Sequence, residues 1–470
     1  MKEFLARWGT LLHRIALMPV AFLGVGLYRA WLATFFRFGA FPHMGFADYA
    51  VFEISIGVVC LIAAALTPKI APLWSNRRVL AATGALSVAG SAVCVVESCL
   101  FSSAVLKYAG LVLAGAGLAL LILVWCEFFG ALNPMRVAIY HAAGIFFGEL
   151  FCWLFMGLDA AYIMAFSIGL PVFSLAWAKR SMERLPEVER PHAQEAGRRG
   201  ELPWKPILLM ATCTFATGFG SLPDQPFTIG NVVGVLSSTA FVFFGSLSNS
   251  RWFNFDTIYR LAFPLMTACL LLVTPLLSRE PLATAACFDA GYTMLSMFVM
   301  IVLSNITYRF GISSVWLNGI ERGIRYLVEA LGWLTFAISD AYLPPQTNAV
   351  VHFAITAAVI AMFLVVTFSE KNLSARWGID LRGGTQDDAD VFAPGQLALR
   401  VSDLSKAHKL SDREEEVLQL IARKVPIQQM EESLFVAQGT IKAHTSRIYR
   451  KLGVHSKEEL FELLGIEEGR

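Results

Sequence analysis

The residues best suited to chemistry form a basic segment near the C-terminus, between positions 438 and 452. Its cations are Lys442, Arg447, Arg450 and Lys451, and no acidic residue interrupts them. Apolar residues recur between these cations at helical spacing, so we expect one amphipathic helix with a charged face. Ammonium and guanidinium groups donate to phosphate oxygens and to guanine edges in the DNA major groove. The segment therefore predicts contact with DNA.

Capping signals predict two helices before this segment. Ser411 and Glu414 form a capping box that opens a helix to about Arg423. A shorter helix should begin at Pro426 and run through Leu434, because proline is favoured in the first turn of a helix.

The basic helix should end at Gly453, since glycine readily adopts the left-handed conformation after a helix. A second capping box, Ser456 with Glu459, should open a fourth helix. The residues expected to face inward are Ile441, Ile448 and Leu452 on the basic helix and Leu460, Leu463 and Leu464 on the fourth. Four short helices with a basic third one predict a helix-turn-helix domain over 409–470.

The same stretch resembles the LuxR/FixJ-type DNA-binding domain. The residues that match this family's pattern are Leu410, Ser411, Arg413, Glu414, Val417, Leu418, Leu434, Thr440, Ile441, Lys442, His444, Ile448, Lys451, Leu452, Gly453 and Val454. The resemblance implies that Lys442, Ala443 and Ser446 face the bases. It implies backbone contacts from Gln438, Thr440, His444, Arg447, Arg450 and Lys451. The implied partners are double-stranded DNA and RNA polymerase.

Three features of the family pattern are missing. Lys424 replaces a glycine, Met430-Glu431 replaces an Ile-Ala pair, and Ala437 replaces the serine before the basic helix. Loss of that serine removes a helix cap worth about 1 kcal/mol. Residues 409–470 hold ten basic and eleven acidic residues, so one copy should bind DNA weakly. We expect a dimer on DNA, paired by the membrane part or by the 460–464 helices.

The rest of the chain is strongly apolar. Its 470 residues are 56% hydrophobic and 16% charged, with a mean hydropathy of +0.58, which is typical of a membrane protein. The expected fold is all-α, with twelve spans of about 20 residues each. We place them near 14–36, 47–66, 79–98, 105–128, 136–157, 160–178, 204–222, 229–248, 256–277, 282–306, 316–338 and 348–368.

The spans divide into two halves, 1–178 and 206–370, separated by a charged cytoplasmic linker at 179–205. A flexible tether, 371–408, follows the last span. This 6+6 arrangement resembles the major facilitator superfamily. The segment TPKIAPLWSNRRVL keeps two arginines of that family's loop motif but lacks its Gly and Asp. That departure counts against active transport.

The distribution of Lys and Arg predicts orientation. With the N-terminus inside, the inner segments before residue 378 hold twenty-one Lys and Arg, including Arg322 and Arg325, against three in the outer segments. The positive-inside rule then places both termini in the cytoplasm, and the chain in the cytoplasmic (inner) membrane of a bacterium.

Glycines four residues apart occur at 144/148, 230/234 and 319/323. Such pairs let helix backbones approach closely. In a facilitator-like bundle these spans would line the contact between the two halves, although 36 glycines could produce several such pairs by chance.

Ionisable residues within spans are costly and usually serve a function. Five of them could line an outward-facing cavity for a cationic or polar small molecule, or one gated by protonation: Arg29, Glu53, Glu149, Asp289 and Glu329. In the alternative interpretation, Glu53 and Asp289 lie near headgroups and Arg29 pairs with one carboxylate structurally.

The sequence predicts a membrane-embedded one-component transcriptional regulator that senses through its bundle and binds DNA through its C-terminal domain. We expect no enzyme, no cofactor and no metal site, because no nucleophile–base pair, phosphate loop or ligand cluster is apparent. The first alternative is a facilitator-type transporter with a degenerate DNA-binding appendage. The second is a regulator merely anchored by its bundle.

Overall fold

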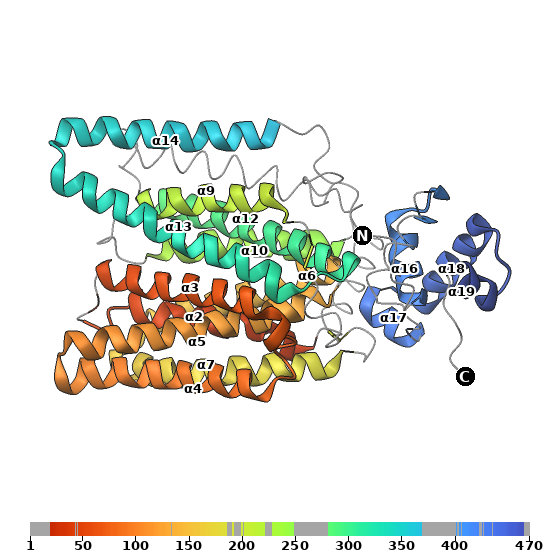
Figure 1. Ribbon diagram of the computed structural model, residues 1–470, viewed down its shortest axis with the longest axis horizontal. Coiled ribbons are helices and arrows are strands. Elements are labelled where there is room, and N and C mark those ends of the chain that lie inside the picture. Colours follow the sequence, from red (N-terminus) through yellow and green to blue (C-terminus); the bar gives the residue numbers. More distant parts are fainter. Residues whose placement is uncertain are drawn as a thin grey trace, which may run out of the picture.

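A computed structural model describes residues 19–464, apart from gaps at 43, 45, 133, 186–189, 192–198, 201, 221–227, 249–280, 369–400, 402–403, 406, 423–424, 426 and 435. Every element assigned within these ranges is helical. The long helices run side by side in a bundle, and the short C-terminal helices form a separate small body (Figure 1).

Helices occur at the predicted spans wherever the structure describes them. The bundle contains η1 (Val20–Gly24), α2 (Val25–Phe36), α3 (Phe46–Ile70), α4 (Arg77–Val96), η2 (Glu97–Phe101), α5 (Ala104–Gly130), α6 (Pro134–Phe155), α7 (Ala160–Arg184), α9 (Trp204–Gly220), α10 (Ile229–Ser248), α12 (Pro281–Phe310), α13 (Ser314–Tyr342) and α14 (Pro345–Phe368). The expected span at 256–277 lies outside the described residues.

Seven helices in the described ranges are long and apolar enough to cross a membrane: Asp48–Ile70, Arg77–Phe101, Ala104–Gly130, Arg136–Phe155, Ala160–Arg184, Ile229–Ser246 and Ala285–Tyr308. A multi-pass membrane protein is therefore established, whereas the number twelve stays a prediction.

The two halves of the bundle meet where α3 packs against α13 and where α6 packs against α10. We call these two contacts the seam. Gly319 approaches the Cys60 carbonyl and Ala64 of α3, and a Cβ added to Gly323 would meet Leu61 at 2.5 Å. The glycine pair at 319/323 therefore lies on the seam, as predicted.

The spans that hold the other two pairs, α6 and α10, also meet at the seam as predicted, but their glycines face other helices. Gly144 and Gly148 pack against Val25 and Gly26 of α2, inside the first half. The pair at 230/234 packs against α12, inside the second half. Glycine spacing reports that two backbones approach closely, but it does not identify the neighbouring helix.

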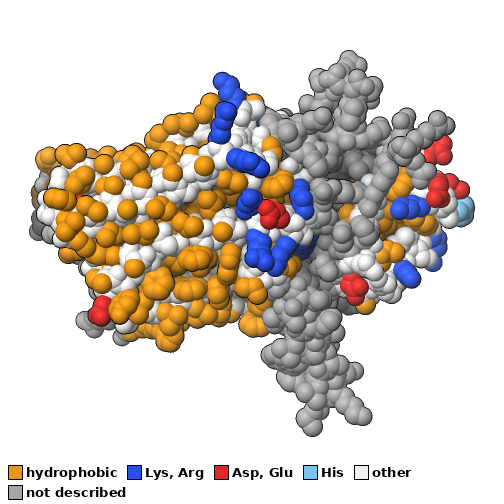
Figure 2. Space-filling view, turned by 90° about the horizontal axis from the view of Figure 1, so that it is seen from below, with side chains coloured by type: hydrophobic (Ala, Val, Ile, Leu, Met, Phe, Trp, Pro, Cys, Tyr) orange, Lys and Arg blue, Asp and Glu red, His pale blue; other side chains and the backbone are white. Residues whose placement is uncertain are grey.

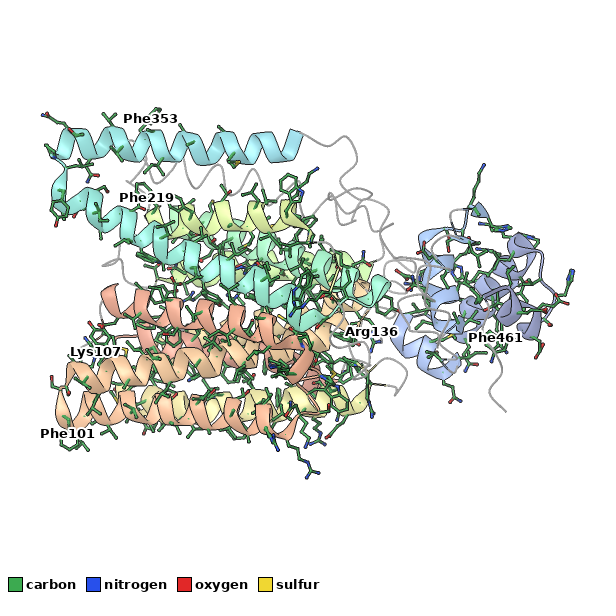
Figure 3. All side chains as sticks on the ribbon, viewed as in Figure 1. Phe101, Lys107, Arg136, Phe219, Phe353 and Phe461 are labelled. Atoms are coloured by element: carbon green, nitrogen blue, oxygen red, sulfur yellow. The ribbon has the colours of Figure 1, made fainter. Side chains whose placement is uncertain are left out.

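Basic side chains gather at one end of the bundle (Figure 2). The exposed ones in the described residues include Lys69, Arg77, Arg78, Lys179, Arg180, Arg184 and Arg199. Figure 3 labels Arg136 at this end and Lys107 at the opposite end, and we name the two ends after these residues. Lys107 pairs with Asp48, with 3.0 Å between the ammonium nitrogen and Oδ2.

Arg322 and Arg325 do not belong with these end-facing cations, which corrects the inner-segment count made from sequence. Both lie within α13, with relative exposures of 5% and 3%. Among the residues that the structure describes, the exposed Lys and Arg still gather at the Arg136 end without these two (Figure 2).

The C-terminal body consists of α16 (Asp412–Ala422), α17 (Ile427–Leu434), α18 (Gln438–Leu452) and α19 (Lys457–Leu464), preceded by short helical pieces from Val401. It has its own hydrophobic core, which is separate from that of the bundle. Val417, Leu418, Ile448 and Leu460 are fully buried in it. A separate core is what a domain needs to fold alone.

Candidate nucleic-acid interface and membrane charge clusters

The polar face of α18 is open to solvent. Its three buried residues are the predicted ones, Ile441, Ile448 and Leu452. The predicted contact residues that are exposed are Thr440, Lys442, Ala443, Ser446, Arg447, Arg450 and Lys451, whereas Gln438 and His444 are half-buried. The exposed group follows spacings of three and four, so it forms one continuous face, and an α-helix is of a size that a DNA major groove admits.

The two ends of α18 are closed differently. Ala437 occupies the N-cap position in an extended conformation, and its side chain makes no capping hydrogen bond. Gly453 has φ of +71° and donates its N–H to the Tyr449 carbonyl, and Val454 donates to the same carbonyl at 3.1 Å. The predicted left-handed C-terminus is therefore present, and the amides of the first turn lack a side-chain cap.

Glu414 joins the beginning of α16 to the end of α18. Its carboxylate accepts from the Ser411 N–H at 2.8 Å, and the Glu414 N–H donates to the Ser411 hydroxyl at 3.3 Å, so the predicted capping box forms. The Lys451 ammonium donates to the same carboxylate at 2.6 Å and to the Lys409 carbonyl at 3.1 Å. Burial opposes ionisation of Glu414, but the bonds from Lys451 and Ser411 outweigh it and lower its pKa. Lys451 thus positions α18 within the domain.

Arg413 holds α17 in place beneath α18. Its guanidinium donates to the Leu434 carbonyl at the end of α17 and pairs with Glu416 at 2.6 Å. A cation at a helix C-terminus satisfies a carbonyl that has no partner within the helix. Both family-matched charged residues of α16, Arg413 and Glu414, therefore fix neighbouring helices relative to one another.

His444 lies between the polar face and the core. Burial lowers its pKa below the usual value, and Arg413 and Arg447 lower it further. Its Nδ1 atom has no hydrogen-bond partner among the described residues. At neutral pH the ring is therefore uncharged, and its Nδ1 atom is buried where a group outside the domain does not reach it.

The fourth helix, α19, is oriented differently from the prediction. Leu460 and Leu464 are fully buried, but Leu463 is 44% exposed and faces outward. Leu460 and Leu464 are thus used inside their own domain, and pairing of two copies through this helix stays a prediction. Phe461 completes the inward face instead. Ser456 caps the helix by accepting from the Glu459 N–H at 3.1 Å.

In the bundle, three predicted cavity residues, Arg29, Glu149 and Asp289, form one charge cluster with residues that the sequence analysis did not select. Glu149 lies 4.0 Å from Arg29 and 3.9 Å from Arg37. Asp289 accepts from the Asn231 side-chain amide at 2.7 Å and lies within electrostatic reach of Arg37. The cluster joins α2 and α6 of the first half to α10 and α12 of the second.

The remaining two predicted residues form a separate pair. Glu53 of α3 and Glu329 of α13 are 1% and 6% exposed, and Glu329 acts electrostatically on Glu53. Arg325 acts on Glu329. The five predicted residues are thus divided between two clusters, and the interpretation of Glu53 as a headgroup-facing side chain does not fit its burial.

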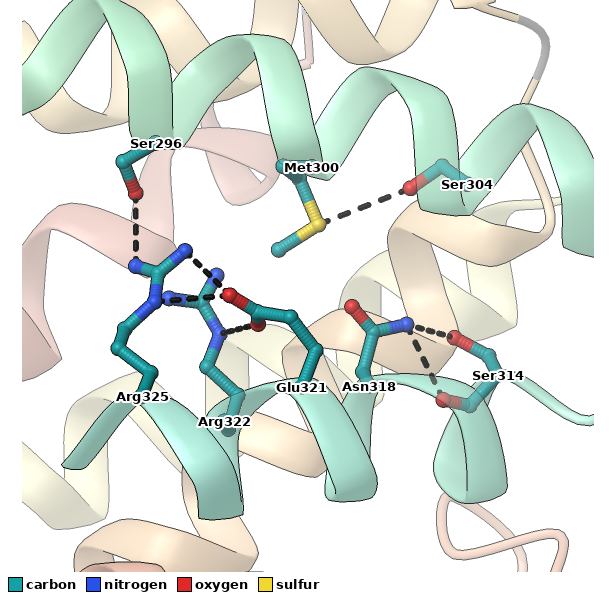
Figure 4. A network of polar contacts seen from close by, with 8 residues as sticks. All are labelled: Ser296, Met300, Ser304, Ser314, Asn318, Glu321, Arg322 and Arg325. Carbon is teal, nitrogen blue, oxygen red and sulfur yellow. Dashed lines mark hydrogen bonds and ion pairs between the residues drawn. The ribbon is translucent and has the colours of Figure 1, made fainter. Parts of the chain in front are cut away.

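A third charged group was missed from sequence. Glu321 lies between two arginines of α13: Arg325 donates to its Oε1 at 2.8 Å, and the Arg322 Nε lies 3.4 Å from its Oε2 (Figure 4). Arg325 also donates to the Ser296 hydroxyl of α12 at 2.9 Å. Charges at positions 321, 325 and 329 share one helical face, and that spacing within an apolar span could have revealed the group.

Comparisons with known proteins support the division of the chain into a membrane part and a C-terminal domain. Residues 408–464 match the family model described as GerE, bacterial regulatory proteins, luxR family. No curated protein matches the chain. The bundle is similar to the proton:xylose symporter XylE of the major facilitator superfamily, with a TM-score of 0.51 and 11% identity over 76% of this chain and 96% of that one.

Two further solved structures are similar to the chain. The nucleoside transporter NupG has a TM-score of 0.45 and 12% identity, over 77% of this chain and 100% of its own. A bacterial homologue of the iron transporter ferroportin has a TM-score of 0.46 and 14% identity, over 77% and 99%. The likeness to XylE shows a facilitator-like fold and nothing about substrate.

The chain is therefore a multi-pass membrane protein with a facilitator-like fold and a luxR-type helix-turn-helix DNA-binding domain at its C-terminal end.

Proposed function

We propose that this protein is a membrane-embedded one-component transcriptional regulator. The exposed polar face of α18 within a luxR-family match is the observation that carries the proposal. Lys442, Ala443 and Ser446 read base edges, while Gln438, Thr440, Arg447 and Arg450 hold the phosphate backbone. His444 adds a hydrogen bond to a phosphate. The domain acts on DNA as a dimer and places RNA polymerase at its target genes.

The location of basic residues supports the orientation that this function requires. DNA lies in the cytoplasm, so the C-terminal domain must lie there too. The positive-inside rule assigns the Arg136 end, where exposed Lys and Arg gather (Figure 2), to the cytoplasmic side of the inner membrane. Twelve spans return the chain after 370 to the side on which it starts.

The buried charge clusters support sensing by the bundle. Ionisable side chains inside a membrane protein are expensive, and proteins keep them where a ligand, an ion or a switch uses them. The Arg29–Glu149–Asp289 cluster and the Glu53–Glu329 pair each join helices of both halves. A small molecule bound at either cluster changes how the halves meet, and this change reaches the tethered domain.

Genome-wide DNA footprinting of the intact protein tests the function, because the regulated genes also indicate the signal. Protected sites should appear upstream of genes whose expression changes when the protein is deleted. Glu149→Gln should then alter the response of those genes without lowering protein abundance. Protein lost from the membrane in this variant would show that Glu149 is structural.

The alternative is a facilitator-type transporter whose DNA-binding domain has lost its role. Substrate flux in vesicles together with an absence of protected DNA sites would favour it. The departures at Lys424 and Ala437 fit a weakened domain, but the intact capping box and exposed α18 face favour the regulator.

A further inference from the structure

Glu53 is a buried carboxylate with no hydrogen-bond partner. It lies on α3, nearer the Lys107 end than the Arg136 end, and its side chain is 1% exposed. Neither carboxylate oxygen has a hydrogen-bond partner among the described residues. A buried polar group without a partner destabilises a fold, and a buried charge without a partner does so far more. Some positive species must therefore complete this site.

Glu329 supplies further negative charge to the site. In the described residues the Glu329 carboxylate of α13 acts on Glu53 as a like charge, whereas the neutral Tyr49 hydroxyl of α3 favours the ionised form of Glu53. Arg325 acts on Glu329, and Arg37 acts on Tyr49, but neither guanidinium acts on Glu53 itself.

The other elements beside Glu53 bring no further cation. Tyr326 of α13 acts on Tyr49 and carries no positive charge. On the α5 side, Gly115 approaches the Phe52 carbonyl and the Ser55 side chain. Within the described part of the chain, the pair of carboxylates therefore has one guanidinium in reach, and that guanidinium acts on Glu329 alone.

Aromatic rings gather around Tyr49, one turn before Glu53 on α3. Tyr49 meets Trp333 edge-on with ring centroids 5.7 Å apart, and it meets Phe36 at 4.8 Å. Phe36 in turn lies 5.5 Å from Phe52. Aromatic faces attract ammonium groups, most strongly where water is excluded. Carboxylates combined with tyrosine and tryptophan rings form an environment suited to an organic cation.

We propose that Glu53 and Glu329 bind a protonated amine at the α3–α13 seam. The ammonium group lies between the two carboxylates, and its substituents contact the Tyr49 and Trp333 rings. Because α3 belongs to the first half and α13 to the second, the amine bridges both halves. The effect of the amine on gene regulation rests on the proposed function. Binding of the amine does not, since it can be measured without DNA.

The close packing beside this site explains how binding would change the bundle. A Cβ added to Gly57 would meet the Leu327 side chain at 2.8 Å and the Gly323 carbonyl at 3.1 Å. The two helices therefore touch backbone to backbone one turn from Glu53. A cation that draws Glu53 and Glu329 together holds the seam closed here, and its departure leaves two carboxylates that repel each other.

Thermal unfolding of the purified full-length protein in detergent at pH 7 tests the site. Methylammonium chloride is the probe, sodium chloride is the salt control, and methanol is the neutral molecule of the same shape. We expect a saturable rise in Tm with methylammonium alone. Glu53→Gln should raise the half-saturating concentration at least tenfold, and Asp48→Asn, whose carboxylate pairs with Lys107 outside both clusters, should leave it unchanged.

Trp333→Phe keeps both carboxylates and gives a second measurement should Glu53→Gln fail to fold. It should raise the half-saturating concentration by about threefold, because phenylalanine attracts cations less strongly than tryptophan. The proposal is overturned if methylammonium produces no saturable shift. It is also overturned if Glu53 governs only the pH dependence of Tm, since the positive species is then a proton. Loss of DNA binding with an intact methylammonium response would overturn the regulator alone.

Discussion

The Lys451 ammonium lies 2.6 Å from the Glu414 carboxylate, and this contact joins the end of α18 to the beginning of α16. Sequence analysis placed Lys451 among the phosphate contacts. The structure gives its ammonium two partners inside the domain, the Glu414 carboxylate and the Lys409 carbonyl. Lys451 therefore sets the angle at which α18 is presented.

Lys451→Met should lower the free energy of unfolding of residues 400–470 by about 1 kcal/mol at pH 7, the upper range for a partly exposed ion pair. The pKa of Glu414 is lowered in the folded state, so the stabilisation is complete above its usual value of 4.5 and is lost as pH falls through the lower, folded value. Urea unfolding at pH 7 and below pH 4 measures this. If Lys451→Met leaves stability unchanged but weakens DNA binding, Lys451 is a phosphate contact, as the sequence predicted.

Ala437→Ser should stabilise the domain, because the serine hydroxyl can accept from an amide of the first turn of α18 that now lacks a side-chain cap. The expected gain is about 1 kcal/mol, which raises the Tm of a domain of this size by roughly 4–8 °C. Ser446→Ala, on the exposed face, is the control and should leave Tm unchanged. An equal Tm for wild type and Ala437→Ser would show that water caps this end adequately.

Binding of DNA should depend on pH through His444. Its lowered pKa keeps the ring neutral in the free domain, and an adjacent phosphate would favour the charged form, so binding would take up a proton. The affinity for duplex should therefore rise as pH falls from 7.5 to about 6, around the ordinary histidine pKa. His444→Gln should flatten this dependence, as measured by fluorescence anisotropy.

The folding stability of the free domain should fall, not rise, as pH is lowered. A histidine with a lowered folded pKa contributes its full stability above 6.5, and this contribution falls as pH drops below that value. An identical pH slope of binding in wild type and His444→Gln would exclude a phosphate contact by this residue.

The gathering of basic residues at the Arg136 end predicts which side of the membrane each end of the bundle faces. Alkaline phosphatase fused after residue 370 should be inactive, because the fusion point is expected in the cytoplasm. A fusion after Pro344, between α13 and α14, should be active and serves as the control. An active fusion after 370 would place the DNA-binding domain outside the cell and overturn the proposed function.

Sequence patterns predicted the local elements well. The capping box at Ser411, the left-handed Gly453 and the buried stripe of Ile441 and Ile448 depend on short-range rules. Each of these rules acts within a few residues along the chain, so the sequence alone contains the required information.

Contacts between distant segments could not be predicted in the same way. The neighbours of Gly144 and the pairing of Glu149 with Arg37 depend on which helices meet in the bundle. Arg322 and Arg325 were assigned to an inner segment, because a charge count does not indicate burial. The outward-facing Leu463 could not be predicted either. Its short helix has more apolar residues than the core of the domain can cover.

The most direct test of the central claim is a binding titration of dimerised residues 400–470 with specific and random duplex at two salt concentrations. Lys442→Ala should flatten preference at a single base pair of each half-site, at a cost of about 1–3 kcal/mol. Arg450→Ala should weaken binding to both duplexes by a similar factor and lower the salt slope by roughly one. If the wild-type domain binds no duplex even when dimerised, α18 does not recognise DNA and the regulator assignment is contradicted.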